Sequence, residues 1–350
     1  MISGKKQIII PLAALLALAL FNLIVNPGFF NISFGYNASG NPILKGDLID
    51  VINDGSELAI LAIGMTIVTA ATGGQDISVG ATLAVAGSAM MRVLCGSNSH
   101  PEIMQAPVIV AFLVGCVAAM LLGAFNGMLV AKFKIQPMVA TLILFTAGRS
   151  IAAWINNNEL PIIKEESFKV YGNLIPGIPI PTPFFIAMLC LIIMALVLKF
   201  TNLGLYTQAV GINENSSRLN GINPTFIKFL SFVILGVCVA VAALIKVSRF
   251  ATINYSVIAK DIEMDAILAV ALGGNSLSGG KFNMWASVLG AYVIQMLTVT
   301  LYKCQVKSDA LPAYKAVVVI LLVVISSPKV RELLSKLGRK ITPTAKVEVK

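Results

Sequence analysis

The chain has 350 residues, of which 57% are hydrophobic and only 12% charged, and its mean hydropathy is +0.88. A water-soluble domain carries about 25% charged residues because its whole surface faces water, so this composition excludes an ordinary soluble protein. The net charge of +10 does not indicate a nucleic-acid partner, because the lysine and arginine residues gather where a membrane protein needs them.

Apolar runs long enough to cross a hydrocarbon core of ~30 Å recur along the chain. No ten-residue segment alternates polar and apolar residues as a membrane β-barrel strand does. We therefore predict an all-α polytopic membrane protein with a single transmembrane domain over residues 1–350 and a basic cytoplasmic tail at 329–350. About ten spans are expected, at residues 7–26, 57–73, 77–94, 107–131, 136–155, 180–199, 227–247, 262–275, 282–302 and 313–328.

The orientation follows from the basic residues. Lys5 and Lys6 precede the first apolar run, which has no small-residue cleavage site after it, so we expect an uncleaved anchor. With the N-terminus in the cytoplasm, more than half of the Lys and Arg residues fall in inner segments, as the positive-inside rule requires. The eighth span, 262–275, is expected to be a short or broken helix, because a re-entrant loop would put the basic tail outside. Both chain ends are then cytoplasmic.

Two stretches interrupt the apolar pattern in the same way, GGQDISVG at 73–80 and GGNSLSGG at 273–280. A Gly pair ends a helix and the following Ser can start the next one. Both stretches fall at the inner end of an outward-to-inward span, which predicts parallel repeats. Paired interruptions in transporters indicate the translocation path, although two ordinary tight turns would look alike. The candidate path residues are Gly73, Gly74, Gln75, Asp76, Ser78, Gly80, Gly273, Gly274, Asn275, Ser276, Ser278 and Gly280.

Two charged residues near membrane depth are further candidates. Asp76 either faces the path, as ionisable groups inside membranes commonly do, or stabilises the N-terminus of the helix after Ser78. Arg149 either extends to the outer interface or faces the cavity together with Thr146, where both would contact substrate.

The largest inner loop, residues 201–226, contains GINENSSRLNGINP. Its stretch Glu214–Asn220 can form two helical turns, and Gly221 with Pro224 beyond it provides a stop. We expect a short amphipathic helix that fits the groove of a partner; a plain connector is the alternative. The predicted docking residues are Gly211, Asn213, Glu214, Ser216, Ser217, Arg218 and Gly221.

The sequence offers no catalytic residue, metal site or cofactor site. A phosphate-binding loop at the second stretch would need Gly at 275 and Ser or Thr at 282, where the chain has Asn275 and Phe282. There is one histidine and no paired Cys/His set. Ion coupling would need several carboxylates inside the helices, and the sequence indicates at best one, Asp76. This favours an external motor, with ATP bound by partner subunits.

Three motifs, in order, resemble the permease subunit of bacterial ATP-binding-cassette sugar importers of the ribose/xylose/galactofuranose type. The family pattern GGIDLSVG is matched by GGQDISVG, with Gln75 in place of Ile, and its cytoplasmic pattern by GINENSSRLNGI, with Ser216 and Ser217 in place of two alanines. The third match is EMDAILAVALGGNSLSGG. The resemblance covers about residues 50–328, and KIQPMVATLILFTAGR and GGKFNMWASVLGAYVIQ look closest to the galactofuranose branch.

The resemblance implies a multi-pass permease of the bacterial plasma (inner) membrane that moves a galactofuranose- or ribose-like monosaccharide into the cytoplasm. It implies as partners a second permease subunit in a homo- or heterodimer, a cytoplasmic ATPase docked near Glu214–Gly221, an extracytoplasmic sugar-binding protein, and membrane lipid. Two alternatives are a stand-alone ion-coupled transporter of a small polar solute, with Asp76 or Arg149 in the coupling, and a membrane scaffold without transport.

Overall fold

The computed structural model describes residues 4–36, 42–175, 178 and 180–326; the predicted basic tail lies outside this range. The described part is a helical bundle, as predicted, and it also contains one small β-hairpin. Its α-helices are α1 (Gly4–Val25), α2 (Asp47–Thr72), α3 (Val79–Cys95), α4 (Val108–Ala131), α5 (Pro137–Ile155), α6 (Thr182–Phe200), α7 (Leu203–Ile212), α8 (Glu214–Leu219), α9 (Pro224–Phe250), α10 (Ile262–Leu272), α11 (Met284–Lys303) and α12 (Leu311–Ser326).

Each predicted span coincides with a helix, α1 to α6 and α9 to α12. Among the described residues, seven helices are long and apolar enough to cross a membrane, whereas α3, α10 and α12 are shorter. The eighth span is indeed short, since α10 has 11 residues. The largest boundary error concerns α2, which begins at Asp47 rather than at residue 57. The sequence placed Asp47 and Asp50 outside the span, but both lie in the first turn of α2. Acidic residues there are stabilised by the positive end of the helix dipole.

One β-hairpin and one α-helix were not predicted from the sequence. Strands β1 (Ser33–Tyr36) and β2 (Pro42–Lys45) form an antiparallel hairpin in the segment between α1 and α2. Helix α7 occupies the first half of the predicted inner loop. Helix α8, by contrast, begins at Glu214 as expected, and the Ser216 N–H donates to Asn213 Oδ1 at 3.0 Å to cap it. Within the described residues, three 3₁₀ turns complete the elements, at Pro27–Phe30, Glu166–Tyr171 and Ser308–Ala310.

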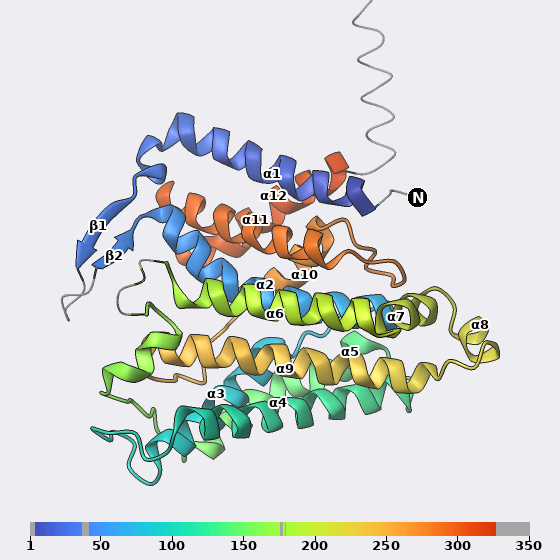
Figure 1. The fold of residues 1–350 in the computed structure, drawn as a ribbon, viewed down its shortest axis with the longest axis horizontal. Coiled ribbons are helices and arrows are strands. Elements are labelled where there is room, and N and C mark those ends of the chain that lie inside the picture. Colours follow the sequence, from blue (N-terminus) through green and yellow to red (C-terminus); the bar gives the residue numbers. More distant parts are fainter. Residues whose placement is uncertain (1–3, 37–41, 176–177, 179, 327–350) are drawn as a thin grey trace, which may run out of the picture.

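The helices lie side by side along the long axis of the molecule (Figure 1). The start of α1, together with α7 and α8, lies at one end, which we name the α8 end, and the β1–β2 hairpin lies at the other, the hairpin end. The start of α1 and helix α8 thus lie on the same side of the bundle, and their cytoplasmic orientation stays a prediction.

Helix α2 is the centre of the bundle, since it is buried without interruption from Gly55 to Ala71 and packs against α6, α9 and α11. Helices α4 and α9 approach closely because small residues face each other: a Cβ on Gly123 would stand 2.5 Å from the Phe232 carbonyl oxygen. The apolar outer faces of α1, α4 and α6 stay exposed. Such faces suit lipid or a second subunit.

Candidate functional site

The two Gly-Gly stretches are helix breaks, as predicted. Helix α2 ends at Thr72, with Gly73 in a left-handed conformation (φ +67°), and α3 begins at Val79. Helix α10 ends at Leu272, and α11 begins at Met284. The positive φ of Gly73 and Gly274 is the conformation that favours glycine at a helix end.

These breaks touch each other, although they lie about 200 residues apart in the chain. The Gly280 N–H donates to the Ala70 carbonyl oxygen at 2.9 Å, and Gln75 Nε2 donates to the Leu277 carbonyl oxygen at 3.1 Å. A Cβ on Gly73 would stand 2.8 Å from the Ser278 carbonyl oxygen. Gln75, the residue that departs from the family pattern, therefore bridges the two stretches.

Asp76 is buried beside the start of α3. Its Oδ1 accepts from the Ser78 N–H at 2.7 Å and from Ser78 Oγ at 2.6 Å, and its Oδ2 accepts from Asn126 Nδ2 at 3.3 Å. These bonds stabilise the first turn of α3, one of the two roles expected for this residue. A role in the path stays a prediction.

In the second break, the buried polar side chain is Asn275, which aligns with Gln75, whereas Ser276 aligns with Asp76. Its Nδ2 donates to Ser287 Oγ at 2.6 Å, and its Oδ1 accepts from the Asn283 N–H at 2.6 Å. The Ser278 N–H donates to Ser276 Oγ at 3.3 Å. The buried amide of Asn275 thus connects the second break to α11, and the carboxylate of Asp76 connects the first break to the start of α3.

The end of α7 reaches the second break and the last turn of α2, which directly precedes the first break. A Cβ on Gly211 would stand 2.6 Å from the Gly280 nitrogen and closer still to the Ala70 carbonyl oxygen. Gly211 is therefore packed backbone to backbone against the end of α2 and against the second stretch. Only glycine fits there without displacing one of them.

Helix α8 itself projects from the α8 end of the bundle (Figure 1). Lys228 Nζ of α9 lies 2.6 Å from Glu214 Oε2, and this hydrogen bond holds the pKa of Glu214 below its usual value. Ser216 and Arg218 are exposed, whereas Ser217 is buried and its Oγ donates to the Asn213 carbonyl oxygen.

Two further features of this segment concern docking. Gly221 has a positive φ of 78° and no atom within 4 Å of a Cβ. Leu219, which was not among the predicted docking residues, is 89% exposed at the tip of α8.

Arg149 and Thr146 lie on α5 but differ in surroundings. Arg149 Nη1 donates to the carbonyl oxygens of Tyr255 and Ile258, at 2.8 and 3.0 Å. It thus holds the non-helical segment 251–261 against the bundle. Thr146 is exposed, and its Oγ1 donates to carbonyl oxygens of its own helix. Substrate contact by either residue stays a prediction.

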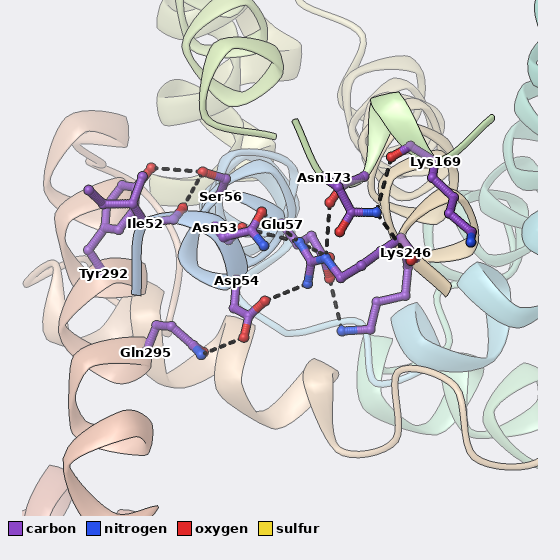
Figure 2. A network of polar contacts seen from close by, with 12 residues as sticks. Ile52, Asn53, Asp54, Ser56, Glu57, Lys169, Asn173, Lys246, Tyr292 and Gln295 are labelled. Atoms are coloured by element: carbon purple, nitrogen blue, oxygen red, sulfur yellow. Dashed lines mark hydrogen bonds and ion pairs between the residues drawn. The ribbon is translucent and has the colours of Figure 1, made fainter. Parts of the chain in front are cut away.

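An ion cluster joins α2, α9 and α11 toward the hairpin end. Arg249 pairs with Asp54 and, at 2.8 Å, with Glu57, whose other oxygen lies 2.9 Å from Lys246 Nζ. Gln295 Nε2 donates to Asp54 Oδ2 at 3.5 Å. Figure 2 shows Asp54, Glu57 and Lys246 turned toward one another, with Gln295 reaching them from α11. The sequence did not indicate this cluster, because its charged residues stand at or beyond the ends of predicted spans, where charges usually meet water.

The expectation of at most one carboxylate inside the helices is wrong. Glu57 is 1% exposed and Glu263, in the first turn of α10, is 2% exposed. Glu263 lies against Gly80 of the first break, and its Oε2 has no hydrogen-bond partner in the described part of the chain. Glu263 is buried because the first turn of α10 packs against the first break, a contact between distant segments that the sequence did not indicate.

A cavity of about 510 Å³ opens beside the ion cluster. Its walls come from α2, α9, the segment 251–261, α10 and α11. Within the described ranges, no group of three or more His, Cys, Asp or Glu residues could hold a metal ion.

Comparison with known proteins identifies the family. The protein-family model described as "Branched-chain amino acid transport system / permease component" matches residues 48–327. The fructose import permease protein FruF of Bifidobacterium longum is 36% identical over 335 residues, or 94% of this chain and 90% of the relative.

Two further relatives come from Escherichia coli. The galactofuranose transporter permease protein YtfT is 36% identical over 320 residues, 91% of this chain and 89% of the relative. The ribose import permease protein RbsC is 30% identical over 321 residues, 91% and 93% of the two chains. No solved structure shows significant similarity. The resemblance drawn from the three motifs is confirmed, and the chain belongs to this family of transport-system permease components.

Proposed function

We propose that this chain is the membrane permease subunit of an ATP-driven importer that brings a monosaccharide into the cytoplasm. The observation that carries this proposal is the near full-length similarity to three proteins named as fructose, galactofuranose and ribose permeases. A galactofuranose- or ribose-like sugar is the proposed substrate class. ATP would be bound and hydrolysed by partner subunits, so this subunit would need no cofactor and no catalytic residue of its own.

The geometry supports a mechanism of coupling. Gly211 touches the end of α2 and the second break at once, so a displacement of α7 and α8 has to move both breaks together. We propose that a cytoplasmic ATPase docks on α8, with Leu219 and Arg218 at the contact. Its motion would then rock the helices that follow the two breaks, α3 and α11, between outward-open and inward-open arrangements.

The remaining partners follow from the same orientation. The α8 end would face the cytoplasm, together with both chain ends, and a sugar-binding protein would dock at the hairpin end. A second permease subunit, identical or different, would cover one of the exposed apolar faces in the plasma (inner) membrane and complete the path. The path would be lined by the two breaks.

The docking part of the proposal can be tested by affinity purification from gently solubilised native membranes. We expect an ATPase to accompany the wild-type chain and to be lost from Glu214→Arg, which puts a cation beside Lys228. Glu102→Arg is the matched control, because Glu102 is 85% exposed near Lys164, remote from α8. Wild-type protein without any ATPase would contradict the ATP-driven importer. Equal retention by Glu214→Arg would contradict the docking site alone.

A further inference from the structure

The cavity beside the ion cluster has the size and shape of a ligand site. Its volume of about 510 Å³ lies within the range of about 300–1,000 Å³ usual for small-molecule pockets. It combines charged side chains with an apolar wall, and its lining includes Gln295 of α11, one of the helices that the breaks would move.

The carboxylates of this cavity are already neutralised. Asp54 pairs with Arg249, and Glu57 pairs with both Arg249 and Lys246. Asp265 lies 2.8 Å from Lys315 Nζ. An incoming ammonium group would have to displace one of these cations, and separating a buried ion pair is strongly unfavourable. The site is therefore poorly suited to an amino acid, whose ammonium group needs a free carboxylate.

The polar atoms that remain available match hydroxyl groups. Lys260 is exposed and has no ion-pair partner among the residues that the structure describes. Asn254 Oδ1 accepts from the Ser256 N–H, which leaves its Nδ2 available, and Gln295 donates to Asp54, which leaves its Oε1 available. The cavity thus offers both donors and an acceptor. A hydroxyl can satisfy either kind because it donates and accepts.

The apolar wall completes the match. Phe250 and Val257 line the cavity and are 58% and 59% exposed, so their surfaces are free to contact a ligand. An aromatic ring beside polar groups suits a molecule with an apolar C–H face and a rim of hydroxyls. Arg149 acts here as a positioning residue, since it holds the segment that carries Asn254, Val257 and Lys260.

From these features we infer that the cavity is a binding site within a single subunit for the transported solute, and that it selects an uncharged cyclic polyol over an amino acid zwitterion. Lys260, Asn254 and Gln295 are its specificity-determining residues. This inference rests on the proposed function and names the place and the chemistry of selection inside this chain.

A cysteine-protection experiment tests the inference on the permease–ATPase complex in nanodiscs. The exposed Cys304 is first replaced by Ser, and the Val257→Cys variant is then labelled with a membrane-impermeant maleimide. D-fructose, D-ribose and D-galactose are the probes, with L-leucine and D-galacturonate for comparison. We expect at least one neutral sugar to slow the labelling about threefold or more, and leucine and galacturonate to leave it unchanged. Lys307→Cys, exposed in the connection between α11 and α12 and outside the cavity, should label without protection.

The specificity residues are tested in the same assay. Lys260→Met should raise the sugar concentration needed for half-protection about tenfold, because a hydrogen bond from a charged donor is lost, whereas Lys307→Met should not change it. A Val257→Cys variant that fails to label, labelling that no neutral sugar slows, or protection by leucine or galacturonate would each overturn the inference. Uptake by the wild-type transporter distinguishes a failure of this inference from a failure of the proposed function. If it imports a neutral sugar while the thiol of the Val257→Cys variant is unprotected, only the cavity is refuted; if it imports none, the proposed function fails.

Discussion

Replacing Gly211 by Ala should disrupt the contact between the α7–α8 joint and the two helix breaks. The added Cβ would stand 2.6 Å from the Gly280 nitrogen and nearer still to the Ala70 carbonyl oxygen. Real Cβ atoms essentially never approach other atoms closer than 3.0 Å. Both neighbours are backbone atoms, so no flexible side chain can turn aside and a whole segment has to move.

The cost has two parts. Overpacking of a filled site costs about 1–3 kcal/mol. The Gly280 N–H to Ala70 carbonyl bond of 2.9 Å lies directly at the added atom, and a buried polar group left unpaired costs about 1–3 kcal/mol more. We therefore expect a loss of about 2–6 kcal/mol at this joint, the sum of the two costs and enough to separate α7 from at least one break.

Thermal unfolding in detergent and sugar-stimulated ATP hydrolysis by the assembled transporter measure the two consequences. Gly211→Ala should lower the unfolding temperature and uncouple hydrolysis from transport. Gly204→Ala on the same helix is the matched control, because the closest atom to its Cβ would belong to the side chain of Leu198, at 3.3 Å. Wild-type unfolding temperature and wild-type coupling in Gly211→Ala would refute the proposed link between α8 and the breaks.

Three further predictions concern polar groups. Arg249→Met should destabilise the bundle by about 3–5 kcal/mol, because it leaves the Asp54 and Glu57 carboxylates with too few cations. The control Lys169→Met, whose pair with Glu166 is exposed, should cost under about 1 kcal/mol. Equal melting curves for the two variants would contradict the stabilising role of the ion cluster. Asp76→Asn should cost about 1–3 kcal/mol and less than Asp76→Leu, since Asn retains an acceptor for Ser78; equal losses in thermal unfolding would argue against the capping role. The pKa of Glu214 is lowered by Lys228, so the stability it adds is present above its ordinary pKa of about 4.3 and disappears as the pH falls through the lowered value. The unfolding temperatures of wild type and Glu214→Gln should therefore differ by a constant amount from about pH 6 to 8 and converge below about pH 4, and a difference that changes within the upper range would disprove this assignment.

Local sequence patterns were sufficient to predict the positions of the membrane helices and of the two helix breaks. The apolar runs predict where each membrane helix lies, because a span needs its own length of apolar residues. The Gly pairs at 73 and 273 predict where α2 and α10 end, since left-handed backbone at a helix end favours glycine. The capped start of α8 at Glu214 is also a local signal.

Long-range packing was not predictable from these patterns. Nothing in the periodicity of the chain indicates that Gln75 reaches Leu277 or that Gly211 fits between Ala70 and Gly280, because each contact joins segments far apart in sequence. The same reason applies to Glu263, whose burial depends on its contact with Gly80, far away in the sequence.

The central claim, an ATP-driven monosaccharide permease, is tested most directly in proteoliposomes that contain this chain with its membrane and ATPase partners. Uptake of labelled D-fructose, D-ribose or D-galactose delivered by the binding protein would be measured with and without ATP on the side of α8, in the presence of ionophores. We predict uptake that requires ATP and persists when all ion gradients are abolished. Uptake that needs an ion gradient and proceeds without ATP would contradict the account.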